Sequence, residues 1–403
     1  METRRIMQEK RYTMHSDKKQ GRMANLEMLR CVAMMMVVVL HYLGKGELLS
    51  DLAGDRLGAG VVAAWLLEAF CIVAVNVYML ISGYFLCCSS FKVSRLIRLW
   101  LQVWVYSVGV GLLGALSGVL TGVDFDAHYL LTLVFPISMG HYWFMTAYVF
   151  LYLLLPFVAA AAGRMTRQQL QAALSLLLFT FCILKSVLPL RLETDGMGYD
   201  CLWYLCVFLT AAYIRRFGIP FLEKSKNCLF LYVGGCLLIF GGTFLLRAVY
   251  LRTGSLGRML KMCLEYNHIL PFLAAVGLFG AFARMKLKGR CAELFCRIGP
   301  CTLGVYLLHE NLGFRYAWQS WFGAGKAAAA MAEGGPGAVG TLLLWTAAAV
   351  LGIFVCGIFV DMLRKGIFDL LHRGLLKFRA YGGLLKRLER VDGLFVPEKE
   401  ARE

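Results

Sequence analysis

Long apolar runs recur along almost the whole chain, and short polar segments separate them. A membrane-crossing helix needs about 20 consecutive apolar residues, because each residue advances the helix by about 1.5 Å and the hydrocarbon core is about 30 Å thick. The chain offers ten runs near that length: 26–44, 60–86, 96–120, 141–161, 170–190, 200–216, 227–247, 266–284, 300–317 and 338–361. We therefore expect an all-α, polytopic membrane protein with about ten transmembrane helices.

The segments outside these runs are short or strongly polar. Residues 128–138 are apolar but too few to cross a bilayer, so we expect an interfacial or re-entrant piece there. The first run carries Arg30 and His41, and no small-residue cleavage site follows it, so it does not read as a cleaved signal peptide. Three parts are expected: a disordered basic lead-in at 1–24, a domain of transmembrane helices at 25–362, and a cytoplasmic amphipathic tail at 363–403 lying on the anionic leaflet.

Composition supports a membrane protein and gives its orientation. The chain is 59% hydrophobic and only 17% charged, which leaves too little polar surface for a water-exposed globule. Its formal net charge is +17, and an amino terminus placed inside puts 32 of the 42 lysines and arginines on the inner side. This positive-inside bias predicts a multi-pass plasma-membrane protein with both termini cytoplasmic. No nucleic-acid-binding motif accompanies the basic excess.

The 14 cysteines are scattered through apolar stretches, and no C-x-x-C occurs. The nearest approach to a cluster, Cys291, Cys296 and Cys301, lacks a matching pair of histidines. We expect small buried hydrophobic side chains, with neither a disulfide framework nor a metal site.

Titratable side chains inside the spans are costly, a few kcal/mol each, so each is a candidate for function. Arg30 and His41 are eleven residues apart, which puts them on one face of the first span and roughly 16 Å apart along its axis. This polar face must contact protein or water rather than lipid. Glu27 is the expected ion-pair partner of Arg30.

Other candidates lie near the ends of later runs. Arg95 and Arg98 share a face at the start of the third run, where two guanidiniums suit phosphate oxygens; positive-inside anchoring is the alternative. Glu68 could orient an imidazole or be a buried protonated acid. Lys185 is expected to extend to the outer interface. Residues expected to line a substrate cavity are His141, Trp143, Tyr306, His309 and Glu310, although an aromatic belt explains Trp143 equally well.

Five motifs in order resemble the membrane-bound acyltransferase-3 family. They are R-x10-H at Arg30 and His41, VNVYMLISGYFL ending at Leu86, R-x-x-R at Arg95 and Arg98, WFMTAYVFLYLLLP, and LGVYLLH. The resemblance covers about residues 24–360, essentially all the spans. The family includes bacterial O-acetyltransferases that modify lipopolysaccharide O-antigen and other surface glycans.

The resemblance implies an acyltransferase with a small acyl group, typically acetyl and alternatively one such as succinyl. The donor substrate would be cytoplasmic acyl-coenzyme A, most simply acetyl-CoA, and the acceptor a hydroxyl of a carbohydrate at the outer face. By matching position, His41 would be the catalytic histidine and Arg30 its companion. Arg95 and Arg98 would receive the coenzyme A.

Several alternatives stay open in the sequence. Either Glu68 or Glu310 could hold the imidazole of His41 in one tautomer, and transfer could be direct or pass through an acyl-histidine. Tyr142, Trp143 and Tyr199 could stack on a sugar. The competing class is a polytopic transporter or flippase for a glycan or small polar substrate, which the lack of a visible repeat disfavours. Membrane lipid is the other expected partner, and the oligomeric state is not indicated.

Overall fold

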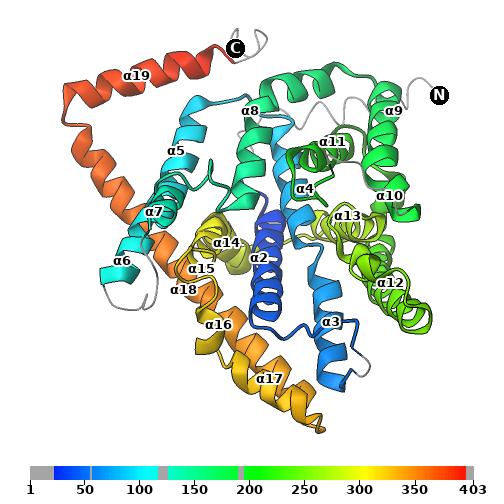
Figure 1. The fold of residues 1–403 in the computed structure, drawn as a ribbon. Helices are drawn as coiled ribbons and strands as arrows, with labels where there is room; N and C mark the ends of the chain where they lie inside the picture. Colours follow the sequence, from blue (N-terminus) through cyan, green and yellow to red (C-terminus); the bar gives the residue numbers. More distant parts are fainter. Residues whose placement is uncertain (1–21, 55–56, 117–125, 189–194, 396–403) are drawn as a thin grey trace.

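The computed structural model describes residues 22–54, 57–116, 126–188 and 195–395, and every regular element in these ranges is a helix (Figure 1). Most of the expected lead-in at 1–24 lies outside the described residues.

Nine helical segments of the described chain are long and apolar enough to cross a membrane. They are formed by α2 (Ala24–Lys45), α3 and α4 (Ala59–Cys71, Ala74–Leu86), α5 with η1 and α6 (Val93–Trp104, Val105–Val110, Gly111–Leu116), α8 (Trp143–Arg164), α9 with η2 and α10 (Arg167–Leu178, Phe179–Ile183, Leu184–Val187), α12 (Ser225–Thr253), η4 and η5 with α13 (Gly257–Met259, Met262–Leu264, Ile269–Ala283), α14 and α15 with η6 between them (Gly289–Ile298, Gly299–Cys301, Thr302–His309), and α18 (Ala338–Leu375).

The remaining expected span, at 200–216, is α11 (Cys201–Phe217), a helix of 17 residues. At 1.5 Å per residue it is about 25 Å long, which is at the short limit for crossing a bilayer. With α11 the described chain contains the ten helices that the apolar runs predict. The all-α, polytopic membrane fold is confirmed.

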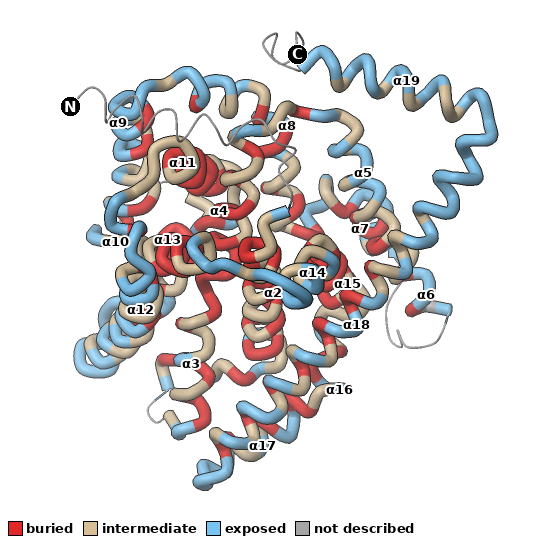
Figure 2. Tube along the Cα trace, turned by 180° about the vertical axis from the view of Figure 1, so that it is seen from behind, coloured by how far each residue is buried: buried red, intermediate tan, exposed pale blue. Residues whose placement is uncertain are grey.

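The helices differ strongly in how far their surfaces are covered. Figure 2 shows α11 and α13 largely buried, whereas few residues of α12 are buried and the C-terminal helix α19 (Arg379–Gly393) is mostly exposed. Large apolar side chains lie on the exposed faces of the spans, including Phe157, Phe230, Leu344 and Phe359. Such surfaces suit contact with lipid, because acyl chains are as apolar as these side chains.

Small residues allow the buried helices to approach closely. A Cβ atom on Gly83 of α4 would lie 2.9 Å from the Cβ of Ala211 on α11. A Cβ on Gly277 of α13 would lie 2.7 Å from the carbonyl oxygen of Cys228 on α12. Both positions need glycine because the two backbones nearly touch there, as is common between membrane helices.

Two short elements match their sequence expectations only in part. Residues 128–138 include α7 (Ala127–Val134), which is too short to span and packs against η1. The hydroxyl of Ser107 donates to the carbonyl oxygen of Leu133 over 2.8 Å. The expected tail does not begin as a separate element at 363, because α18 continues without a break to Leu375.

The tail helix α19 then turns back toward the start of α5, as Figure 1 shows at the top of the molecule. The carboxylate of Asp392 accepts hydrogen bonds from the backbone N–H of Ser94 (3.1 Å) and from its hydroxyl (2.5 Å). The rings of Phe395 and Phe91 meet with their centroids 4.8 Å apart. The tail is therefore fastened to the first turn of α5.

The structure corrects the expectation for Lys185. Its side chain does not extend to the surface but is buried, with ion pairs to Asp195 (2.6 Å) and Glu265 (2.7 Å). It also donates to the side-chain oxygen of Asn267 over 2.8 Å. Two carboxylates and an amide replace the water that a lone ammonium would need. All 14 cysteines are free thiols and most are buried, as the sequence predicts.

Candidate active site

One face of α2 lines a cavity of about 250 Å³. Arg30, Met34, Val37 and His41 all contribute to it, at spacings of four, three and four residues that follow the turns of a helix. The prediction that Arg30 and His41 share a face is confirmed. The Arg30 guanidinium also pairs with Glu27 over 3.2 Å, as its spacing predicts.

The cavity has two chemically different ends, named here the arginine end and the histidine end. At the arginine end, Arg30 is joined by Arg95 of α5, and both guanidiniums act electrostatically on Tyr148. Arg98 does not line the cavity; its side chain is exposed and donates to the carbonyl oxygen of Ser94 over 3.3 Å. The structure therefore brings Arg95, and not Arg98, to the cavity.

The histidine end carries His41 together with Trp143 and Tyr306. The Trp143 ring lies 4.3 Å from that of Tyr199 and is stacked on that of Tyr266 at 5.8 Å, measured between centroids. Since Arg30 and His41 are eleven helical residues apart, the two ends are separated by roughly 16 Å. The residues that line the cavity between them are mostly apolar.

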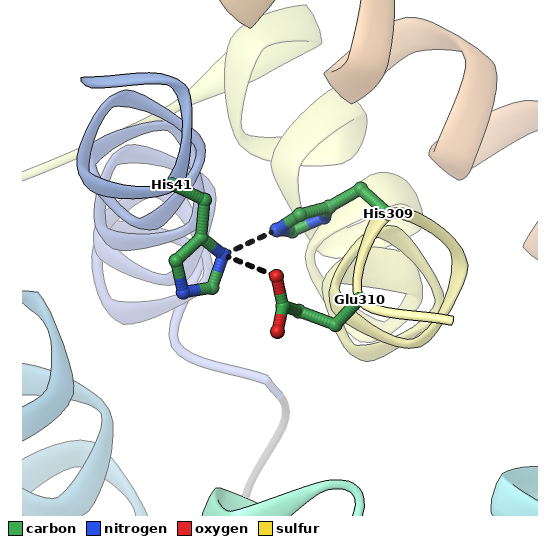
Figure 3. A group of neighbouring side chains, drawn as sticks. All are labelled: His41, His309 and Glu310. Atoms are coloured by element: carbon green, nitrogen blue, oxygen red, sulfur yellow. Dashed lines mark hydrogen bonds and ion pairs between the residues drawn. The ribbon is translucent and has the colours of Figure 1, made fainter. Parts of the chain in front are cut away.

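The imidazole of His41 makes two side-chain contacts through the same nitrogen, as drawn in Figure 3. Its Nδ1 lies 2.9 Å from Nε2 of His309 and 3.1 Å from Oε1 of Glu310. His309 is the last residue of α15, which packs against α2, and Glu310 follows it directly. His41 and His309 are 268 residues apart in the sequence.

Two cations hold the carboxylate of Glu310 in place. Lys45, one helical turn after His41 on α2, forms an ion pair with Oε1. The Nη2 atom of Arg315 lies 3.4 Å from Oε2. Glu310 itself is only 3% exposed, so its charge is balanced by these partners rather than by water.

The hydrogen bonds fix the tautomers of both imidazoles. Nδ1 of His309 lies 2.6 Å from the carbonyl oxygen of Val305, which can only accept, so this nitrogen carries the proton. In neutral His309 the other nitrogen, Nε2, must then accept, and Nδ1 of His41 must donate to it. The lone pair of neutral His41 is therefore on Nε2, which points away from His309 and Glu310 (Figure 3).

The same three side chains also carry the kinds of donor atom that bind metal ions. One ligand atom from each of His41, His309 and Glu310 falls within 4.8 Å of the others. Two nitrogens bound to one tetrahedral zinc would be about 3.3 Å apart, given Zn–N bonds of about 2.0 Å. The observed 2.9 Å is a hydrogen-bond distance, and the Lys45 ammonium already occupies Glu310. In the described geometry the three side chains form a hydrogen-bonded and ion-paired network.

Two of the expected site residues do not line the cavity and make no direct contact with His41. Glu68 is on α3, where the nearby charge acting on it is that of Lys261, and it does not line the cavity. Of the two carboxylates considered as partners of His41, the structure brings Glu310 into contact. His141 is buried between α7 and α8 and does not line the cavity either. Neither of its ring nitrogens has a hydrogen-bond partner among the described residues.

Several neighbours of His41 were missed in the sequence. Lys45 follows His41 by four residues, so it could have been found from helical spacing. Arg315 lies in the turns after α15, and Trp318 and Gln319 begin the four-residue helix α16 (Trp318–Trp321), which is too short for a periodic pattern to place them. Nε1 of Trp318 donates to the carbonyl oxygen of His309 over 3.1 Å, and Nε2 of Gln319 donates to that of Arg315 over 2.9 Å.

The described helices of membrane-spanning length enclose a half-buried histidine whose lone pair is directed away from a fixed hydrogen-bond network, and they define a multi-pass membrane protein. The chain matches the acyltransferase domain of the acyltransferase-3 family over residues 23–361. It belongs to that family and is a multi-pass membrane acyltransferase. No curated protein and no solved structure matches it significantly.

Proposed function

We propose that the protein transfers an acetyl group from acetyl-CoA to a hydroxyl of a cell-envelope carbohydrate. One observation carries the proposal: a single cavity is lined by two arginines at one end and by His41, whose Nδ1 is engaged by His309, at the other. A polyanionic donor and a reactive base would thus meet in one site.

The arginine end suits the phosphates of coenzyme A. Arg30 and Arg95 offer planar guanidiniums, which form strong charge-assisted hydrogen bonds to phosphate oxygens. The lysines and arginines of the chain are concentrated on the same side as these residues when both termini are cytoplasmic. On this proposal the protein lies in the plasma membrane, with the arginine end facing the acyl-CoA pool. The apolar middle of the cavity would then hold the uncharged pantetheine arm.

The histidine end supplies the chemistry. In direct transfer, Nε2 of His41 takes the proton of the acceptor hydroxyl while its oxygen bonds to the thioester carbon. The carbon–sulfur bond then breaks, and the proton passes from His41 to the departing thiolate. Positive charge on the imidazole is stabilised by Glu310, which lies 3.1 Å from Nδ1. A route through an acyl-histidine starts from the same lone pair.

The acceptor is proposed to enter at the histidine end. Trp143, Tyr199 and Tyr266 form an aromatic group at this end, and 47% of the Tyr199 surface remains exposed. Aromatic faces pack well against the apolar face of a sugar ring, which leaves its hydroxyls free to reach His41.

The test is acetylation of the envelope glycans in cells that depend on this chain. His41→Ala should abolish labelled acetyl incorporation while the protein remains in the membrane at the normal level. His372→Ala is the matched control, because that imidazole is exposed near the end of α18 and contacts Tyr381. Undiminished acetylation in the His41→Ala cells would refute the proposed function.

A further inference from the structure

Several buried polar atoms without a hydrogen-bond partner belong to residues in or near the His41 network. They include both ring nitrogens of His141, Nε of Arg315, the hydroxyl of Tyr306 and the side-chain oxygen of Gln319. Folded proteins pair nearly all such atoms, because leaving them unpaired after removal from water costs free energy. A group of them beside a candidate base indicates a ligand that supplies the missing partners.

Gln319 and Arg315 contact the His41 network directly, Tyr306 lies beside it, and His141 is linked to it by the charges that act on it. Nε2 of Gln319 lies 3.5 Å from the carbonyl oxygen of His41, and Arg315 pairs with Glu310 over 3.4 Å. The Tyr306 ring lines the cavity, 6.1 Å from that of His309 between centroids. The charges that act on His141 are those of Arg315, Glu310 and Lys45, the same ones that surround His41.

Of these residues, His141 has the most unpaired atoms, because both of its ring nitrogens lack a partner. It is 6% exposed, it precedes the span that begins at Trp143, and both of its nitrogens are unpaired. Burial, and after it the positive charge of Arg315, lowers the pKa of His141 to about 4. At neutral pH the ring is therefore uncharged and offers one donor and one acceptor. A hydroxyl group, which both donates and accepts, is the matching partner.

We propose that His141 is a specificity-determining residue that binds a second hydroxyl of the acceptor, distinct from the one that is acylated. Arg315 and Gln319 supply one further donor and one further acceptor for the same polyhydroxylated molecule. The inference rests on the proposed function, because it assigns these atoms to the acceptor of that reaction. It selects acceptors by their pattern of hydroxyls, since a buried site built to hydrogen-bond a hydroxyl rejects molecules that lack it.

The test uses the full chain in membrane vesicles, with labelled acetyl-CoA and the glycan fraction extracted from the producing cells, quantified as total hexose. His141→Phe should raise the half-saturating glycan concentration about tenfold or more. The half-saturating acetyl-CoA concentration and the glycan-independent hydrolysis of acetyl-CoA should stay within about twofold. His128→Phe, on the exposed surface of α7, is the matched control and should change none of these values.

A second pair of variants guards against loss of folding. His141→Gln keeps a donor and an acceptor at similar reach, whereas His141→Asn is shorter by one methylene. The half-saturating glycan concentration should be higher for the Asn variant than for the Gln variant. Equal values for the two, or an unchanged value for His141→Phe, would overturn the inference and leave water as the only partner of the ring.

The two proposals fail in distinguishable ways. If wild-type vesicles transfer acetyl to the glycan and His41→Ala stops the transfer, the proposed function holds whatever His141 does. If wild-type vesicles transfer none, the proposed function falls and the role of His141 falls with it.

Discussion

At the scale of single residues, His309 decides which nitrogen of neutral His41 carries the lone pair. The Val305 carbonyl fixes the proton of His309 on Nδ1, and this leaves Nε2 to accept from His41. The prepared lone pair of His41 thus depends on a backbone carbonyl one helical turn before His309. Glu310, held by two cations, adds a negative charge beside the same imidazole.

Replacing His309 by Phe should therefore reduce turnover roughly 10²-fold, in the range that general acid–base contributions span. The half-saturating acetyl-CoA concentration should change little, because the arginine end is untouched. The measurement is steady-state transfer over a range of pH, since loss of the orienting contact also shifts the pH profile. A variant with normal turnover and an unshifted profile would show that His309 does not position His41.

A second residue-scale prediction separates the two arginines that the sequence pairs. Both side chains are exposed, but Arg95 lines the cavity, whereas Arg98 does not and donates a hydrogen bond to its own helix. Arg95→Ala should raise the half-saturating acetyl-CoA concentration roughly tenfold or more, because a hydrogen bond to a charged group is worth about 1.5–3 kcal/mol. Arg98→Ala should raise it much less. Equal effects in a titration of acetyl-CoA would contradict the cavity assignment.

At the scale of elements, the start of α5 depends on the tail. Asp392 of α19 caps the first turn of α5 through Ser94, the residue directly before Arg95. Partial burial tends to raise the pKa of Asp392, but the hydrogen bonds from Ser94 outweigh it and hold the pKa below its ordinary value. The ionised form is therefore the one that favours docking. This contribution is complete above the ordinary pKa of about 4 and is lost as the pH falls through the lower folded value.

Asp392→Asn should loosen this contact at neutral pH, where the wild-type carboxylate is ionised. Faster hydrogen exchange at the Ser94 amide is the expected result in protein held in lipid nanodiscs. Asp369→Asn, which changes an exposed acid on α18, is the control and should leave the exchange unchanged. If Asp392→Asn exchanges like the wild type, then α19 does not hold the start of α5.

The helices themselves could be predicted well, because the length of an apolar run reports directly on the thickness of the bilayer. The shared face of Arg30 and His41 also followed from spacing within one helix. The contact between His41 and Glu310 could not be predicted, since helical spacing says nothing about which distant helix packs opposite a residue. Glu68 looked equally suitable for that reason, and Lys185 misled because its two carboxylate partners lie in later segments.

At the scale of the whole molecule, the cavity connects the two ends of the proposed active site. It lies among α2, α4, α5, α8 and α15, so residues from both halves of the chain line the same cavity. Its two ends are separated by roughly 16 Å, about half the thickness of the hydrocarbon core. We therefore predict that donor and acceptor approach His41 from opposite faces of the membrane.

Sided transfer in sealed proteoliposomes tests this central claim most directly. Vesicles would contain the glycan fraction in their lumen and receive labelled acetyl-CoA only from outside, with the purified full chain inserted in the membrane. If transfer crosses the membrane, labelled glycan will appear inside intact vesicles, and none will appear when the chain carries His41→Ala. Transfer only when donor and acceptor share one compartment would contradict this claim.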